Sequence, residues 1–214
     1  MIVYGSSLSP FVRKTLAYVS EKGLAVEVKP IALGASDPDF LACSPFRKMP
    51  AFRDGDFTVS DSTAIITYLE AKHPEPALIP AQPKSRARTI WYEEFADTIL
   101  AACMGKMFFN RLVAPKFLGR AGDLAAADKA EREELPPLLD YLERMLGESG
   151  GQHLVDGRLT LADLAVASPF ANLQHLGVCV AAAKHPKTAA FIAAIHARPS
   201  FAPLIARERA FLAR

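Results

Sequence analysis

The stretch PFRKMPAFRDGDFTVSDSTAIITYL, residues 45–69, decides the fold of this chain. It contains two short runs of apolar and β-prone residues, at 51–52 and 57–59. Between them lies Asp54-Gly55, a dipeptide that is among the strongest short-range signals for a hairpin turn. The stretch therefore predicts a β-hairpin. Pro50 belongs at the start of its first strand or at a bulge, because proline cannot donate a hydrogen bond to the ladder.

A helix start follows the hairpin directly. Asp61 and Ser62 carry oxygens that can accept hydrogen bonds from the unpaired N–H groups of a first helical turn. Apolar residues then recur at helical spacing over 65–69, which predicts a helix from about Asp61 to Lys72. The hairpin therefore ends at a helix N-terminus.

This combination resembles the glutathione site of the cytosolic glutathione transferases. The resemblance implies a cis Met49–Pro50 peptide bond, and it implies that the backbone of Met49 pairs like a strand with the cysteinyl part of glutathione. It also implies that Asp61 and Ser62 hold the γ-glutamyl end. The family more often has Glu at the position of Asp61. The shorter Asp61 keeps the negative charge, but whether its carboxylate reaches the γ-glutamyl ammonium stays open. The alternative for Asp61 is a plain helix N-cap.

The overall charge excludes some classes of partner. Lys and Arg number 25 against 23 for Asp and Glu, and this net charge of +2 is too balanced to indicate nucleic acid or an anionic membrane as the main partner. The N-terminus lacks a basic region with a long apolar core, and no unbroken apolar stretch of about 18 residues occurs. These features predict a cytoplasmic protein that does not span a membrane.

The cysteines and histidines predict neither disulfides nor a metal site. Cys43, Cys103 and Cys179 lie far apart and form no CxxC motif, so we interpret them as buried or incidental thiols in a reducing compartment. The five histidines show no metal-ligand spacing. We therefore expect no metal.

The first 76 residues predict a thioredoxin-like βαβαββα order. Besides the hairpin and its helix, the predicted segments are a strand at 1–4, a turn at 5–9, a helix at 10–23, a strand at 25–31 near a sheet edge, and a short helix at 36–43.

A proline-rich segment, PEPALIPAQP at 74–83, predicts a stiff linker. We therefore expect a thioredoxin-like glutathione-binding domain at 1–76, a linker at 77–84 and an all-helical domain at 85–214. The predicted helices of the second domain are 84–112, 125–146, 161–176, 185–197 and 200–212. Thr160 and Asp163 form a capping box that resembles the one in the C-terminal domain of the family, and Arg198-Pro199 also resembles a family feature.

Ser9 is the candidate catalytic residue. Ser9-Pro10 is the expected N-cap and N1 pair of a helix, and this bland interpretation requires no catalysis. The loop also resembles the serine-type site of bacterial transferases related to the tau, omega and zeta classes, and counting back from residues 21–23 places Ser9 where the tau class has its catalytic serine. A hydroxyl at that position would donate a hydrogen bond to the glutathione thiolate.

Other donors in the loop remain open. Ser6 and Ser7 compete with Ser9, and Tyr4 lies early enough to favour a place in the core. The same counting places Pro10 and Phe11 where zeta-class isomerases carry Ser and Cys, which argues against a maleylacetoacetate isomerase. The absence of cysteine at position 9 argues against thiol transfer of the omega type.

Basic residues are expected near the glycyl carboxylate of glutathione. Lys48 occupies the position at which related enzymes have a basic residue, and Arg13 and Arg47 are possible helpers or ordinary surface charges. An electrophile pocket is expected between the domains, where three side chains share a helical face that would also suit a core or a dimer contact: Met104, Phe108 and Arg111.

Together these features predict a glutathione transferase that ionises bound glutathione, its co-substrate, and conjugates the sulfur to small apolar electrophiles. The family resemblance and the apolar content around Trp91, Phe95 and Phe108 predict a homodimer. The alternative is a non-catalytic module of the same fold that carries ligands or assembles proteins, because fold does not fix function.

Overall fold

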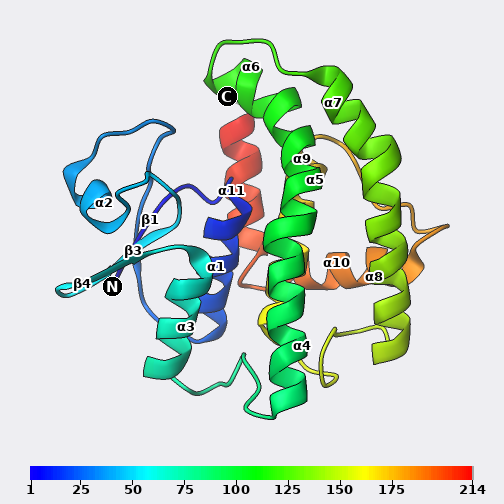
Figure 1. Cartoon of the computed structure of the whole chain (residues 1–214), viewed down its shortest axis with the longest axis horizontal. Helices are drawn as coiled ribbons and strands as arrows, with labels where there is room; N and C mark the ends of the chain where they lie inside the picture. The colour runs from blue at the N-terminus through cyan, green and yellow to red at the C-terminus, as the bar shows by residue number, and fades with distance from the viewer. Residues whose placement is uncertain (214) are drawn as a thin grey trace. The chain divides into compact units, whose positions relative to one another are not determined.

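The structure is a computed structural model that describes residues 1–213. The chain divides into two compact units (Figure 1). The first contains Met1–Leu78 together with the segment that begins at Arg198, and the second contains Ile79–Ala197. The division falls within the segment 77–84 that the sequence assigned to a linker.

The first unit has a four-stranded mixed sheet. Its elements are β1 (Ile2–Tyr4), α1 (Pro10–Glu21), β2 (Glu27–Lys29), α2 (Pro38–Cys43), β3 (Ala51–Asp54), β4 (Phe57–Ser60), α3 (Ser62–Lys72) and α11 (Ala202–Leu212). The strand order is β2-β1-β3-β4, with β1 parallel to β2 and the other pairs antiparallel. The predicted βαβαββα order is confirmed, and β2 lies at an edge as the following Pro30 indicated.

Both faces of the sheet are covered. Val3 and Phe52 are fully buried, and so are Ile65 and Ile66 of α3, which contacts α1. The alternate residues of the strands join a separate apolar cluster with α2, made of Tyr4, Ile31, Phe40, Cys43 and Ala51. Successive residues of β1 and β3 therefore face opposite sides of the sheet, and each side has its own apolar packing.

The hairpin turn lies one residue later than the sequence indicated. Asp54 pairs with Phe57, so the two turn residues are Gly55 and Asp56. Gly55 has a φ of 62°, which a two-residue hairpin loop requires at its first central position. Asp54 stays in the strand, where its carboxylate accepts hydrogen bonds from the hydroxyl of Tyr68 and the ammonium of Lys72, both on α3.

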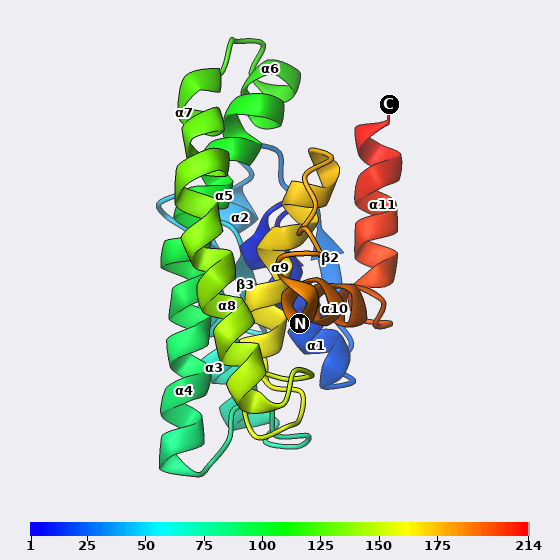
Figure 2. The ribbon, with the colours of Figure 1, turned by 90° about the vertical axis from the view of Figure 1, so that its right-hand side faces the viewer.

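The second unit is entirely helical within the described residues. Its elements are α4 (Pro83–Glu94), η1 (Phe95–Leu100), α5 (Ala101–Phe108), η2 (Phe109–Val113), α6 (Ala114–Phe117), α7 (Leu124–Lys129), η3 (Ala130–Glu134), α8 (Leu135–Ser149), α9 (Leu161–His175) and α10 (Pro186–His196). The three η segments are π-helical turns inside longer helices. Figures 1 and 2 both show the helix from α4 to α6 running beside the helix from α7 to α8.

Helix α9 is the buried centre of the second unit, since every residue from 161 to 173 is buried. The carboxylate of Asp163 is fully buried and accepts hydrogen bonds from the N–H groups of Thr160 and Leu154, at 2.8 and 2.9 Å. The predicted capping function of Asp163 is therefore confirmed, and the same side chain also fixes the loop before the helix.

The last helix groups with the first unit, whereas the sequence assigned it to the helical domain at 85–214. Glu208 on α11 forms an ion pair with Arg13 on α1, and Arg198 pairs with Glu21 at the end of α1. These contacts join the C-terminal segment to the thioredoxin-like unit. Helical periodicity at 200–212 predicted the helix but carries no information about its partner.

Candidate glutathione site

The strand register of the first unit brings three connecting segments together at one end of the strands, which we call the edge of the sheet below. Tyr4 of β1 lies opposite Ala51 of β3, which lies opposite Ser60 of β4. The loop after β1, the segment before β3 and the turn after β4 therefore meet at this edge. These three segments contain the predicted residues of the first unit.

Gly5 allows the loop after β1 to approach the segment before β3. Its φ is +144°, and a Cβ atom at this position would lie 2.7 Å from Cγ2 of Val12 and 3.4 Å from Cβ of Met49. No side chain fits in this space. The absence of a side chain at Gly5 therefore places the serine loop against Met49.

Ser9 is the N-cap residue of α1, but its side chain does not cap the helix. The backbone is extended, with φ −73° and ψ 126°, and the carbonyl of Ser9 accepts the first helical hydrogen bond from the N–H of Arg13 at 2.9 Å. The hydroxyl forms no capping bond and has no other partner within residues 1–213. A half-buried hydroxyl at a positive helix end is therefore available to an anion.

The competing donors differ in their surroundings. The Ser6 hydroxyl accepts a 3.4 Å bond from the N–H of Leu8, while the Ser7 hydroxyl has no partner in the described part of the chain. Tyr4 is buried in the α2 cluster, and this burial raises the pKa of its phenol. Ser7 is thus the remaining structural competitor of Ser9.

The peptide bond between Met49 and Pro50 is cis, as the resemblance implied. Lys48, just before it, is exposed, and its backbone is held by Ser44. The Ser44 hydroxyl donates to the Lys48 carbonyl at 2.8 Å and accepts from the Lys48 N–H at 2.9 Å. The sequence analysis did not single out Ser44. A serine four residues before Lys48 is a local signal for such a turn, because serine hydroxyls bond to nearby backbone groups.

Asp61 serves as the N-cap of α3. Its Oδ1 accepts hydrogen bonds from the N–H groups of Thr63 and Ala64, at 2.8 and 3.2 Å. Its φ is 82°, which is unusual for a residue with a side chain, and Ser62 beside it is buried. The N-cap alternative is thus present in the structure, and Oδ2 of this exposed residue is left for a cationic ligand group.

Arg13 and Arg47 differ in their availability to a ligand. Arg47 is exposed, whereas Arg13 is fully buried and its guanidinium is bound to Glu208. Arg13 therefore does not serve as a helper at the glycyl carboxylate. Of the three basic residues that the sequence suggested, Lys48 and Arg47 are therefore exposed and available to a ligand.

Comparison with known proteins identifies the family of this chain. Residues 3–77 match the model of the glutathione S-transferase N-terminal domain, and residues 111–208 match that of the C-terminal domain. Glutathione S-transferase 3 of Zea mays is 36% identical over 213 residues, which cover 95% of this chain and 92% of the relative. The chain belongs to the glutathione S-transferase family.

Other members of the family match over similar lengths. A glutathione S-transferase of Hyoscyamus muticus is 30% identical over 96% of this chain and 97% of its own. The crystal structure of glutathione transferase F7 from Populus trichocarpa superposes with a TM-score of 0.82 at 28% identity, covering 97% of this chain and 98% of that one. These matches establish the glutathione S-transferase fold over both units.

The residues predicted for the electrophile pocket of this family member lie on the helix from α5 to η2. Met104 and Phe108 are 1% and 8% exposed, so both are buried in this structure. Arg111 is half-buried and pairs with Asp128 and Glu131. The pocket itself therefore stays a prediction.

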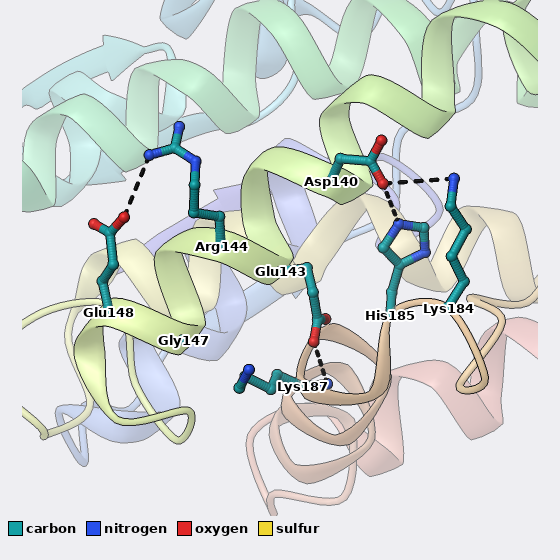
Figure 3. Close-up of a pocket in the computed structure, with 8 residues that line it drawn as sticks. All are labelled: Asp140, Glu143, Arg144, Gly147, Glu148, Lys184, His185 and Lys187. Atoms are coloured by element: carbon teal, nitrogen blue, oxygen red, sulfur yellow. Dashed lines mark hydrogen bonds and ion pairs between the residues drawn. The ribbon is translucent and has the colours of Figure 1, made fainter.

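The second unit carries an open groove of about 550 Å³ between α8 and the start of α10 (Figure 3). Its carboxylates are all paired. Asp140 binds His185 at 2.7 Å and this contact holds the pKa of the carboxyl below its usual range, while Glu148 pairs with Arg144. Glu143 accepts hydrogen bonds from the first N–H groups of α10. The groove is thus a polar joint between two helices.

Within residues 1–213, no group of three or more His, Cys, Asp or Glu side chains is arranged to hold a metal ion. Within the same range, the helices are too short or too polar to cross a bilayer.

Proposed function

We propose that the hydroxyl of Ser9 stabilises the thiolate of glutathione bound at the edge of the sheet, and that this glutathione transferase conjugates the sulfur to small apolar electrophiles. The observation that carries the proposal is the free Ser9 hydroxyl. It lies at the N-terminus of α1, yet it leaves the helix uncapped. A serine selected only for capping would bond to the N–H groups of the first turn.

The chemistry requires such a donor. A free thiol with a pKa of about 8.5 is only about 3% ionised at pH 7. A hydrogen bond from Ser9 and the positive end of α1 both favour the anion, and each unit by which the pKa falls corresponds to about 1.4 kcal/mol. The thiol proton leaves to solvent, and Ser9 keeps its own proton throughout.

The thiolate then attacks the electrophilic carbon. A C–S bond forms, and in a substitution the leaving group departs with the electron pair of its bond to carbon. In an addition the electron pair moves onto the acceptor, which takes a proton from solvent. The protein holds glutathione so that its sulfur faces Ser9 while the two charged ends are fixed elsewhere.

The remaining residues of the edge suit the two ends of glutathione. We assign the γ-glutamyl ammonium to Asp61 and the adjacent carboxylate to Ser62 at the start of α3. The backbone of Met49, before the cis Pro50, would pair with the cysteinyl unit. Lys48 is exposed beside it and suits the glycyl carboxylate.

The proposal also includes a homodimer, a cytoplasmic location and a site for the electrophile. The exposed rings of Phe46 and Trp91 favour a homodimer, because such rings are common in the apolar centre of interfaces. A glutathione-dependent enzyme with three free cysteines also suits a reducing compartment, and we place it in the cytoplasm. The electrophile would bind near Met104, Phe108 and Arg111.

The decisive experiment is the titration of the bound thiol in Ser9→Ala, followed by thiolate absorbance near 240 nm. If Ser9 is the donor, the thiol pKa rises by at least about one unit. Ser7→Ala and Ser6→Ala are matched controls, since a shift in either one instead relocates the donor. If none of the three shifts the pKa, the serine mechanism is wrong.

Turnover separates the enzyme from the non-catalytic alternative. The wild-type protein should be retained on a glutathione resin and should conjugate glutathione to a chlorinated dinitroarene. Retention without turnover of this or other electrophiles would favour a ligand-binding module.

A further inference from the structure

Helix α1 is joined to the C-terminal segment by an ion pair at each of its ends. Near its start, Nε of Arg13 donates to Oε1 of Glu208 at 3.0 Å and Nη2 donates to Oε2 at 2.7 Å. Near its end, Arg198 donates to Glu21 in the same two-pronged way, at 2.7 and 2.9 Å. Both pairs thus connect α1 to the segment that begins at Arg198.

The two pairs differ in burial. The side chains of Arg13 and Glu208 are 0% and 2% exposed, while those of Arg198 and Glu21 are 35% and 14% exposed. A buried guanidinium and carboxylate stabilise each other only in good geometry, and removal of one partner leaves an uncompensated charge. The orientation of the first turn of α1 is therefore tied to Glu208.

The two pairs also differ in their distance from Ser9. The N–H of Arg13 donates to the carbonyl of Ser9, so the two residues share the first hydrogen bond of the helix. Val12, next to Arg13, lies against Gly5 at the start of the serine loop. Glu21 is the last residue of α1 and has no such link to the loop.

We infer that Arg13 and Glu208 are positioning residues for the glutathione reaction, which hold the first turn of α1 so that the Ser9 hydroxyl meets the thiolate. This inference rests on the function proposed above. The planar fork of Arg13 fixes direction as well as distance. Displacement of a reacting group by about 1 Å can lower the rate about 100-fold. A small shift of this turn would therefore weaken the hydrogen bond from Ser9 to the sulfur and slow the reaction.

The test compares Glu208→Gln with its matched control Glu21→Gln in the full-length protein. Both substitutions remove one carboxylate that binds an arginine across the same two segments. We expect Glu208→Gln to raise the pKa of the bound glutathione thiol by at least about half a unit, which lowers the thiolate fraction below that pKa about threefold. Glu21→Gln should leave the thiol pKa unchanged, although both variants lose thermal stability.

If Glu208→Gln does not fold, a second variant tests the same inference. Glu208→Asp keeps the charge but shortens the side chain by one methylene group. The two hydrogen bonds from Arg13 should lengthen, while the buried cation keeps its counter-ion. The thiol pKa should rise in the same direction by a smaller amount. A thiol pKa that is unchanged in every Glu208 variant that folds, or that shifts equally in Glu21→Gln, would overturn the inference.

Ser9→Ala, measured in parallel, separates this inference from the proposed function. A higher thiol pKa in Ser9→Ala without a shift in Glu208→Gln would refute the positioning function alone. An unchanged thiol pKa in Ser9→Ala would refute the serine mechanism on which the inference rests. If both hold, the double variant should show no further rise, because Glu208 acts only through Ser9.

Discussion

The backbone N–H of Asp61 donates a hydrogen bond to the carbonyl oxygen of Pro50, at 3.2 Å. The bond joins the turn after β4 to the residue that follows the cis peptide bond. Asp61 reaches this position with a φ of 82°, which few residues other than glycine adopt. The acid and the segment proposed to pair with the cysteinyl unit are therefore held together before any ligand binds.

Asp61 should contribute separately to folding and to glutathione binding. Asp61→Asn keeps a capping oxygen and a residue that tolerates positive φ, so stability should change little while glutathione binding weakens by about 1.5 to 3 kcal/mol. Asp61→Ala should also lose about 1 kcal/mol of folding stability. Calorimetry with glutathione and thermal unfolding measure the two effects. Unchanged affinity in Asp61→Asn would place the γ-glutamyl site elsewhere.

The homodimer is testable through Phe46, whose ring is 85% exposed on the loop before Lys48. An aromatic side chain buried at an interface often contributes 2 kcal/mol or more to association. Because both protomers carry the substitution, Phe46→Ser should raise the dimer dissociation constant by at least about 30-fold. Light scattering across micromolar concentrations measures the mass. A wild-type monomer would refute the dimer, and a variant with wild-type association would exclude Phe46 from the interface.

The three cysteines should react at different rates. Cys43 and Cys103 are buried, and burial raises the pKa of the Cys103 thiol to about 11, whereas Cys179 is exposed. Because the thiolate is the reactive form, an aromatic disulfide reagent should label one thiol rapidly in the native protein. Peptide mapping should find the label on Cys179. Rapid labelling that persists in Cys179→Ser would contradict the prediction.

The ion pair at the end of α1 should make stability depend on pH. Burial alone would raise the pKa of Glu21, but hydrogen bonds from Arg198 and Ser200 outweigh it and lower the pKa below its usual 4.5. The folded protein therefore binds this proton less readily than the unfolded chain. The contribution is fully present above pH 4.5 and disappears as the pH falls through the lowered value.

Thermal unfolding of wild type and Glu21→Gln between pH 7 and pH 3 tests this dependence. The wild type should be more stable at pH 7, and the difference should shrink as the pH falls below about 4.5. A difference that stays constant across the range would show that titration of Glu21 does not contribute.

Much of the first unit was predictable because its signals are local. The hairpin and the helix start at Asp61 both follow from residues within one short stretch, and the family resemblance of that stretch implied the cis Met49–Pro50 bond. The turn was placed one residue early, because the dipeptide Asp54-Gly55 does not reveal that Tyr68 and Lys72 hold Asp54 in the strand.

The candidate site shows where sequence patterns stop being informative. The dipeptide Ser9-Pro10 is the same in a helix that the serine caps and in one where the serine faces a ligand. Only the structure shows that the Ser9 hydroxyl forms no capping bond. Arg13 looked like a surface cation, because its partner Glu208 is 195 positions away. Helical spacing likewise placed Met104 and Phe108 on one face without distinguishing a core from a pocket.

The return of α11 to the first unit also has a consequence for synthesis of the protein. A ribosome adds about 5 to 20 residues per second, so Glu208 follows Arg13 by about 10 to 40 s across the 195 intervening positions. For most of that time, once β4 has been translated, the nascent thioredoxin-like sheet has all its strands but lacks the counter-ion for a cation that it must bury. Completion of this unit therefore waits until almost the whole chain has been translated.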